Sequence, residues 1–539
     1  MKLVKPLFIS SLLAVALAGC STQKSYLTIK DAAPIEISGA VKKKSKIEEK
    51  DLQRWSHLDL LKDSIPGMSV DRAYEELIKG AKGQKVIVGV IDSGIDIEHP
   101  DLARVIWTNA KEIANNKKDD DNNGYVDDIH GWSFLGNAIH ENYEFIRLLK
   151  KPNDGSADYK RALEEYEEKM AEAQAGKQQL DYMKSLEPTI LNHLKKSTYT
   201  LEDLEAIETT DEELLAAKEA LTRIHKFGNI EDFRKRITAF ENYVNSQLKY
   251  HFNKEFNGRA VVGDNPDDIN DTKYGNNDVI GLEKDEAKHG THVAGIIAQV
   301  RHNGLGGDGV ASNVEIMALR AVPDGDEYDK DIALAIRYAV DNGAKVINGS
   351  FGKYYSPHRQ WVIDAMKYAA EKDVLIVIAA GNDTYDVDKI NKFPNDSYDG
   401  DDEYSDNVVI VGALNHSYDD KMLAAFTNYG KKNVDVFAPG VKIYATTPNN
   451  KYEYLQGTSM ASPNVAGVAA MIRSYYPSLT AAQVKQILKD SSIKPTHKVS
   501  IIDERTNEKI EKSFSEFSVS GGIVNAYNAL IMASKMVKK

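Results

Sequence analysis

Short runs of apolar and β-branched residues recur along the chain and predict buried strands. The first covers residues 85–92 (KVIVGVID), and three others begin at Val314, Ala344 and Val374. Runs of this length are typical of a parallel sheet, whose strands are buried on both faces. Segments with helical spacing, residues 330–342 and 361–372, lie between the runs. The alternation predicts βαβ units, and therefore an α/β fold: a mostly parallel sheet with helices on both faces.

Residues 157–257 follow a helical pattern instead. Their apolar side chains recur every three or four positions among many charges, in stripes such as Tyr159, Leu163, Tyr166 and Met170, or Phe233, Ile237, Phe240, Val244 and Leu248. Residues 210–213 have the form of a capping box, and Gly228 ends the helical run that follows. We therefore expect an inserted α-helical region of three or four helices at residues 135–257. It would divide the remaining domain into residues 55–134 and 258–530.

The N-terminal residues have the pattern of an export signal. A basic start is followed by an uncharged stretch, residues 6–18, which is too short to span a bilayer, and then by Gly19 and Cys20. Residues 17–20 (LAGC) resemble the lipobox of bacterial lipoproteins, which implies a signal peptide at residues 1–19 and a lipid on Cys20. The alternative is a secreted protein in which this thiol is incidental. Residues 20–54 are polar and indicate a solvated tether or linker.

Composition narrows the class of protein. The chain has 539 residues, and 42% of them are hydrophobic, which is ample for a buried core. Its formal net charge of −13 argues against nucleic acid as a partner, because phosphate binding requires a basic surface. Cys20 is the only cysteine, so no internal disulfide can form. The oligomeric state is not predicted.

Polar residues follow several of the predicted strands and helix starts. Asp92 closes the first strand, His289 opens HGTHVAG, Asn382 closes VLIVIAAGN, and Ser459 begins a helix in GTSMASP. The carboxyl ends of parallel strands form the ligand-binding edge of such a sheet. A serine becomes nucleophilic when an imidazole accepts its proton, a carboxylate orients that imidazole, and an amide stabilises the oxyanion. Taken alone, Ser459 could equally be a helix-capping residue.

These segments resemble the subtilisin family of serine endopeptidases. The resemblance rests on residues 90–102, 289–295, 348–352, 379–382 and 457–463, and on the chain order Asp, His, Ser. It implies a catalytic triad of Asp92, His289 and Ser459, an acyl-enzyme mechanism on peptide bonds, and Asn382 in the oxyanion hole. It also implies a wall of the substrate cleft at Ser350, Phe351 and Gly352. We expect the second histidine, His292, to be a packed helix residue.

Two calcium sites are expected. Asp119, Asp121, Asn123 and Asp127 follow the spacing of the first half of an EF-hand loop, although position twelve would be His130. The alternative is an acidic turn without metal. The family resemblance implies a second site that draws on Asp101 and Asn303.

Together these patterns predict a serine endopeptidase of the bacterial cell envelope that acts on polypeptides and is held at a membrane by the lipid on Cys20. Ser21 follows the cysteine, so the aspartate signal for inner-membrane retention is absent and the outer membrane is favoured. A catalytically inactive binding lipoprotein, an esterase and a structural envelope protein are alternatives. An α/β-hydrolase esterase would need Gly-x-Ser-x-Gly, which Ser459 lacks. The insertion could be a lid, a docking arm or a solvated addition.

Overall fold

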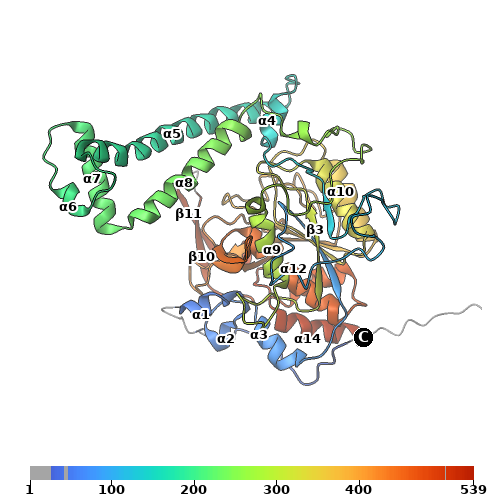
Figure 1. Ribbon diagram of the computed structural model, residues 1–539. Helices are drawn as coiled ribbons and strands as arrows, with labels where there is room; N and C mark the ends of the chain where they lie inside the picture. Colours follow the sequence, from blue (N-terminus) through green and yellow to red (C-terminus); the bar gives the residue numbers. More distant parts are fainter. Residues whose placement is uncertain (1–25, 40, 42–46, 504–505, 539) are drawn as a thin grey trace, which may run out of the picture.

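The computed structural model describes residues 26–39, 41, 47–503 and 506–538. Its centre is a seven-stranded sheet with strand order β2-β3-β1-β4-β5-β6-β7, in which all neighbouring strands are parallel (Figure 1). The strands are β1 (Val86–Asp92), β2 (Gly131–Ser133), β3 (Val314–Arg320), β4 (Val346–Gly349), β5 (Leu375–Ala379), β6 (Val408–Leu414) and β7 (Val436–Pro439). The predicted signal peptide and Cys20 lie outside the described residues.

Helices pack against the sheet in two layers. α9 (Lys288–Ala298) and α12 (Thr458–Tyr475) contact each other and the central strands, whereas α10 (Asp329–Asp341) and α11 (Arg359–Glu371) pack together against β1, β3 and β5. Figure 1 shows α10 across β3 from α9 and α12. At Gly89 of β1, an added Cβ would lie only 3.1 Å from Ala339 of α10, so this strand and helix approach closely. The predicted α/β fold is therefore confirmed.

The predicted elements have clear counterparts. The four apolar runs correspond to β1, β3, β4 and β5, and the two predicted helices correspond to α10 and α11. Strands β2, β6 and β7 were not expected, nor were the antiparallel hairpins β8 (Ile443–Thr447) with β9 (Lys451–Leu455) and β10 (Lys498–Asp503) with β11 (Glu508–Ser513). The remaining elements of this part of the chain are η5 (Lys284–Ala287), α13 (Ala481–Asp490), η6 (Phe514–Glu516) and α14 (Ala526–Val537).

The insertion forms an arm (residues 135–257) that projects from the sheet domain (Figure 1). Its elements are α4 (Glu144–Leu149), α5 (Ala157–Leu194), α6 (Leu201–Glu205), α7 (Glu212–Phe227), α8 (Ile230–Ser246) and η3 (Gln247–His251), and η4 (Gly258–Val261) follows it. Asp211, one residue later than the predicted box begins, caps α7 by accepting the Leu214 amide. Gly228 ends this helix as expected.

Two separate apolar clusters hold the arm together. The tip cluster consists of arm residues alone: Leu186, Ile190, Leu204, Ile207, Leu214, Ala217 and Leu221. The base cluster consists of Phe145, Ile146, Leu149, Ala162, Ala173, Phe252 and Tyr355. Because Tyr355 belongs to the sheet domain, the base is continuous with that domain, whereas the tip packs on itself.

The described part of the predicted tether packs on the sheet domain. Leu27 and Ile35 are each only 6% exposed, and the Tyr26 amide donates to the carbonyl of Tyr475 (2.9 Å). The Asn528 side chain exchanges two hydrogen bonds with the backbone of Ile35, at 2.6 and 2.9 Å. This packed course differs from the solvated linker expected for residues 20–54, because its apolar residues find partners on α12 and α14.

Several short helices then lead into β1: α1 (Glu49–Leu52), η1 (Trp55–His57), α2 (Leu60–Asp63), α3 (Val70–Arg72) and η2 (Ala73–Ile78). Among the described residues, no helix combines the length and the apolar character that crossing a membrane requires.

Candidate active site

The carboxyl edge of the sheet brings an aspartate and a histidine together. Asp92 is the last residue of β1 and is 2% exposed, while His289 is the second residue of α9. The Nδ1 atom of His289 lies 2.7 Å from Oδ1 of Asp92. Gly290 allows this approach, because a Cβ there would lie 2.2 Å from the carbonyl oxygen of Gly94. The carboxylate therefore orients the imidazole and leaves Nε2 as the nitrogen that can accept a proton.

The electrostatic setting of His289 favours its protonated form. Burial lowers the pKa of the imidazole, but the charge and hydrogen bond of Asp92 outweigh this effect and raise the pKa above its ordinary value of 6.5. The side chain still keeps 39% of its surface exposed, so it remains accessible. A raised pKa suits a group that takes a proton and later returns it.

Ser459 stands at the start of α12, beside the end of β4. Gly457 occupies the N-cap position of this helix, and the Ser459 hydroxyl donates to the carbonyl of Ser350 (3.2 Å). In return, the Ser350 hydroxyl donates to the carbonyl of Ser459 (2.9 Å). Among the described residues, Ser459 therefore neither caps its helix nor bonds to His289. Catalytic hydrogen bonds of this kind often tighten only when substrate binds.

Two hydrogen-bond donors flank the space beside Ser459. The side-chain oxygen Oδ1 of Asn382 accepts hydrogen bonds from the backbone amide and the hydroxyl of Thr458, at 2.8 and 3.0 Å. These bonds fix the direction of the NH₂ group of Asn382. A Cβ placed on Gly457 would lie 3.6 Å from Asn382 Nδ2 and 3.5 Å from the Ser459 amide nitrogen. Gly457, at φ +149°, leaves that space open. The two nitrogens therefore border one open space, which fits the oxyanion hole expected at Asn382.

The expected cleft wall lies directly beside Ser459. Asn348 donates to the Ser350 hydroxyl (2.9 Å) and accepts from Ser462 of α12 (2.9 Å), so the end of β4 is joined to the start of that helix. Phe351 is half-buried and Gly352 is exposed. These positions suit a surface against which an extended peptide can lie.

Lys392 is a site residue that the sequence did not reveal. Its buried ammonium donates to the carbonyls of Phe351 (2.9 Å) and Ala379, and so bridges the wall after β4 and the segment that leads to Asn382. Burial lowers the pKa of Lys392 to about 8, against the opposing charges of Glu327 and Asp383. No local pattern marks this lysine, because its two partners are distant in sequence.

His292 is a packed helix residue, as expected. It is fully buried, and its Nε2 lies 3.1 and 3.0 Å from the carbonyl oxygens of Ile443 and Glu453. Burial lowers the pKa of His292 to about 3, so the ring stays neutral.

The acidic loop after β1 gathers a group of carboxylates that only partly matches the prediction. Asp119, Asp121 and Glu112 offer oxygen atoms within 4.8 Å of one another. Glu112 is 8% exposed, and its Oε2 has no hydrogen-bond partner in the described chain. An orphaned carboxylate oxygen beside two others fits a hard cation such as calcium.

Two of the predicted ligands point elsewhere. The Asp127 carboxylate accepts from the amides of Asn116 (3.1 Å) and Lys117 (2.8 Å), and Asn123 donates to Asp128 (2.9 Å). Glu112 replaces them in the group. The EF-hand pattern did not include Glu112, because this residue precedes the loop in sequence and only the folded chain brings it beside Asp119 and Asp121.

Asp101 and Asn303, the second expected calcium pair, do lie in contact. Asn303 donates to Asp101 (2.5 Å), whose carboxylate also accepts from the Val300 amide (3.0 Å) and from Tyr452 (3.2 Å). Both Asp101 oxygens therefore already have protein partners. This pair fits a metal less well than the Glu112 group does.

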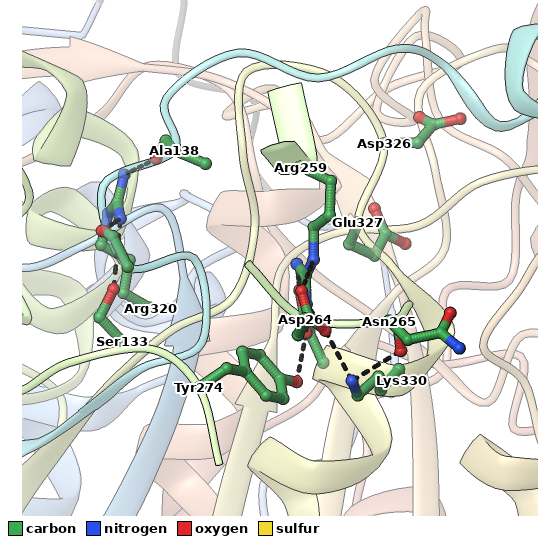
Figure 2. Close-up of polar contacts among 12 residues, drawn as sticks. Ser133, Ala138, Arg259, Asp264, Asn265, Tyr274, Arg320, Asp326, Glu327 and Lys330 are labelled. Atoms are coloured by element: carbon green, nitrogen blue, oxygen red, sulfur yellow. Dashed lines mark hydrogen bonds and ion pairs between the residues drawn. The ribbon is translucent and has the colours of Figure 1, made fainter. Parts of the chain in front are cut away.

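Arg320, the last residue of β3, fixes the place where the chain enters the arm. Figure 2 shows it beside Ser133 and Ala138, to which it donates at 3.2 and 2.6 Å. It also donates to the carbonyl of Ser93 (3.1 Å), next to Asp92. One buried side chain thus ties the root of the arm to the end of β1.

Arg259 fixes the place where the chain leaves the arm. Its guanidinium forms bidentate pairs with Asp264 (2.6 and 2.8 Å) and Asp331 (2.5 and 2.8 Å). Lys330 donates to Asp264 (2.6 Å), and Tyr274 donates to Asp331 (2.5 Å) (Figure 2). Both roots of the arm are therefore held by buried ionic groups.

The fold and site define a class: a hydrolytic enzyme built on a parallel α/β sheet, with an Asp–His pair and a serine at the carboxyl edge of that sheet. A family model described as the subtilase family matches residues 83–517, which is most of the chain. The protein belongs to the subtilase family.

Relatives match a smaller share of the chain than the family model does. The chain is 40% identical over 243 residues to a thermophilic serine proteinase of Bacillus sp. (strain AK1), covering 45% of this chain and 52% of that protein. It is 34% identical over 255 residues to subtilisin-like protease 1 of Plasmodium falciparum (44% of this chain, 36% of the relative). It is 38% identical over 209 residues to subtilisin DY of Bacillus licheniformis (38% and 70%). The match thus spans about half or less of the first two relatives.

Among solved structures, a protease from Pseudoalteromonas arctica PAMC 21717 is 31% identical, with a TM-score of 0.36, covering 46% of this chain and 70% of that one.

Proposed function

We propose that this protein is a serine endopeptidase that cleaves polypeptides through an acyl-enzyme. The observation that carries the proposal is the 2.7 Å contact between Asp92 and His289, at the sheet edge where Ser459 begins α12. Family membership supports it. The alternatives of an inactive binding protein or a structural protein leave this assembled pair unexplained.

In the proposed reaction, Ser459 Oγ attacks the carbonyl carbon of the peptide bond while His289 Nε2 takes the hydroxyl proton. The Ser459 amide and Asn382 Nδ2 donate to the oxyanion. The intermediate collapses when His289 gives the proton to the leaving amine, which leaves an acyl ester on Ser459. Water, deprotonated by His289, then hydrolyses this ester and regenerates the enzyme.

A fluorophosphonate probe tests this function, because it labels only an activated serine. We expect labelling of the parent protein and cleavage of a casein substrate, with both lost in Ser459→Ala. Ser474→Ala, a change in a buried serine at the other end of the same helix, should keep the label. Labelling of Ser459→Ala at the parent level would refute the assignment of the nucleophile.

We propose that a lipid on Cys20 holds the enzyme at a membrane of the cell envelope, the outer membrane being favoured because Ser21 follows the cysteine. The export pattern of residues 1–19 supports this. Cys20→Ser protein should be recovered in the soluble fraction, whereas the parent sediments with membranes. Retention of Cys20→Ser on membranes would show that another element anchors the chain.

We also propose that Glu112, Asp119 and Asp121 bind calcium. A ligand that binds only the folded state stabilises it, by about 2.7 kcal/mol at 100 times its Kd. Calcium should therefore raise the Tm of the parent relative to a chelator. Glu112→Gln should lose most of this rise, whereas the matched variant Asp101→Asn should keep it. Equal Tm values for the parent with calcium and with chelator would exclude the site.

A further inference from the structure

The base of the arm contacts the active site through the residues that directly follow the cleft wall. Lys353, Tyr354 and Tyr355 come immediately after Gly352. Lys353 is buried and pairs with Glu144 of α4 (2.7 Å) and with Asp329 (2.9 Å). The wall thus continues into a segment that the arm holds.

Helix α5 holds this segment at two points. Arg161 donates to the carbonyl of Tyr354 (2.8 Å), and its guanidinium lies over the ring of Tyr355, 4.1 Å from the centroid. The Tyr355 hydroxyl donates to Glu165 (2.8 Å), one turn further along the helix. Tyr355 also packs in the base cluster, so both its ring and its hydroxyl belong to the arm interface.

Tyr354 carries the contact onward to the oxyanion loop (residues 380–385). Its hydroxyl donates to Asp383, the residue after Asn382, and accepts from the Asn428 side chain (3.0 Å). The same hydroxyl would lie 3.3 Å from a Cβ placed on Gly381. The Tyr354 hydroxyl therefore bonds to the residue after Asn382 and lies near the residue before it.

Asn428 completes the support of this loop. Its side chain donates to the carbonyl of Ala380 (2.9 Å) and accepts from the amides of Asp383 (3.0 Å) and Tyr385 (2.8 Å). Its own amide donates to the carbonyl of Gly381 (3.0 Å). The Asn382 side chain is exposed and is oriented by Thr458, whereas its backbone lies between residues that these bonds hold in place.

We propose that the base of the arm positions the oxyanion hole: Arg161 and Tyr354 are positioning residues that act through the oxyanion loop on Asn382. The proposal rests on the proposed peptidase function and deepens it. It makes the insertion a support of the site rather than a lid, and only the base is needed, because the tip cluster contains no residue of the sheet domain.

Kinetics of Tyr354→Phe test the proposal, because this variant keeps the ring and removes only the bridging hydroxyl. Loss of one oxyanion donor costs roughly 10²–10³-fold in kcat, and loosening that donor should cost a part of this, about tenfold, with KM changed less than about twofold. Arg161→Ala, at an exposed side chain, should lower kcat by about threefold. Unchanged kcat in both variants would overturn the proposal.

A double-mutant cycle then asks whether Tyr354 acts through Asn382. In an Asn382→Ala background the donor is already absent, so adding Tyr354→Phe should change kcat by less than about twofold. A further loss of about tenfold in that background would mean that Tyr354 acts by another route, and it would overturn the positioning role.

Hydrogen exchange provides a measurement that does not depend on activity. In the full-length chain with Ser459→Ala, both Tyr354→Phe and Arg161→Ala should speed exchange of the Asp383 and Tyr385 amides. Lys177→Ala, on the same helix but in a solvent-facing pair with Asp181, is the matched control and should not. Unaltered exchange in the two test variants would refute the positioning proposal even if the protein is a peptidase. Faster exchange in these variants, with a parent protein that has no peptidase activity, would refute the peptidase function but support the coupling of Arg161 and Tyr354 to the oxyanion loop.

Discussion

The sheet domain and the part of the arm beyond its base hold their charged side chains in opposite settings; at the base, Glu144 and Arg147 of α4 are buried and paired as in the sheet domain. In the sheet domain, Lys330 and Asp331 are fully buried, and Arg259 joins them in a network of salt bridges. Along α5 the charges form exposed pairs one turn apart, such as Lys177 with Asp181. Buried charges must be paired, because an unpaired one loses its hydration without compensation. Exposed pairs are screened by water and contribute little.

The difference shows which charged side chains are essential for stability and catalysis. In the sheet domain, removing one charged partner leaves the other charges buried and unpaired, so single substitutions should lower stability or activity strongly. Beyond the base of the arm, the helices depend on apolar stripes, and the charges mainly keep their outer faces solvated. The predictions below test this contrast, starting with the largest expected effect.

Asp92→Asn should lower kcat by about 10⁴-fold, because an amide favours the wrong tautomer of the histidine and does not stabilise the imidazolium. Steady-state kinetics on a peptide substrate measure the loss. The folded structure should persist, which circular dichroism checks. A loss below tenfold would show that the buried carboxylate is not needed for the reaction.

Arg259→Met should lower the free energy of unfolding by about 3–5 kcal/mol, since Asp264 and Asp331 lose a shared bidentate partner. Methionine keeps most of the aliphatic stem, so the loss reports on charge. Denaturant unfolding followed by tryptophan fluorescence measures it. A change below about 1 kcal/mol would mean that Lys330 and water suffice, and the contrast with the arm would fail.

Leu221→Ala should destabilise the tip of the arm by about 3 kcal/mol, because Leu221 is fully buried in the tip cluster. Limited proteolysis should cut residues 186–224 faster. Peptidase activity should stay at the parent level, since this cluster contains no residue of the sheet domain. Reduced kcat with an intact sheet domain would show that the tip does reach the site.

The pH dependence of the reaction should reflect the pairing of His289. Since its pKa is raised above 6.5, kcat/KM should fall as pH drops through a midpoint above 6.5. For stability the sign is opposite: the ion pair contributes fully below pH 6.5 and is lost as pH rises through the raised pKa. In Asp92→Asn the acid limb should move to lower pH. A midpoint that does not move would contradict the assigned coupling.

Lys177→Ala should change the free energy of unfolding by only about 0.3–0.5 kcal/mol, the usual contribution of an exposed pair at i,i+4. Parallel unfolding measurements with Arg259→Met give the direct comparison. A loss above about 2 kcal/mol would mean that charge pairs on the arm are as important as those in the sheet domain.

Local patterns revealed the parts of the fold that depend on neighbours in sequence. β1, β3, β4 and β5 are continuous apolar runs, and α10 and α11 have clear helical spacing, so each could be predicted without knowing its partners. The candidate site residues Asp92, His289, Asn382 and Ser459 could be named from the sequence because short motifs surround them. Strand β2 has three residues, too few to carry a periodic signal.

Residues that act through distant partners could not be predicted. Lys392 matters because its ammonium reaches Phe351 and Ala379, and Glu112 because a turn brings it beside Asp119. In the predicted tether, Leu27 and Ile35 looked like isolated apolar residues, but the fold supplies surfaces on α12 and α14 to receive them. Their roles are set by the tertiary fold, which periodicity does not encode.

The docking of the N-terminal segment has a consequence for how the enzyme would face a membrane. With a lipid on Cys20, only six peptide units separate the bilayer from Tyr26, a reach of at most about 20 Å. Tyr26 is fastened to Tyr475, at the end of α12 opposite to Ser459. That helix places the nucleophile about 24 Å beyond the attachment point. A lipid on Cys20 would therefore attach the protein at the end of α12 opposite to the catalytic edge, and leave that edge open to substrates that approach from the aqueous side.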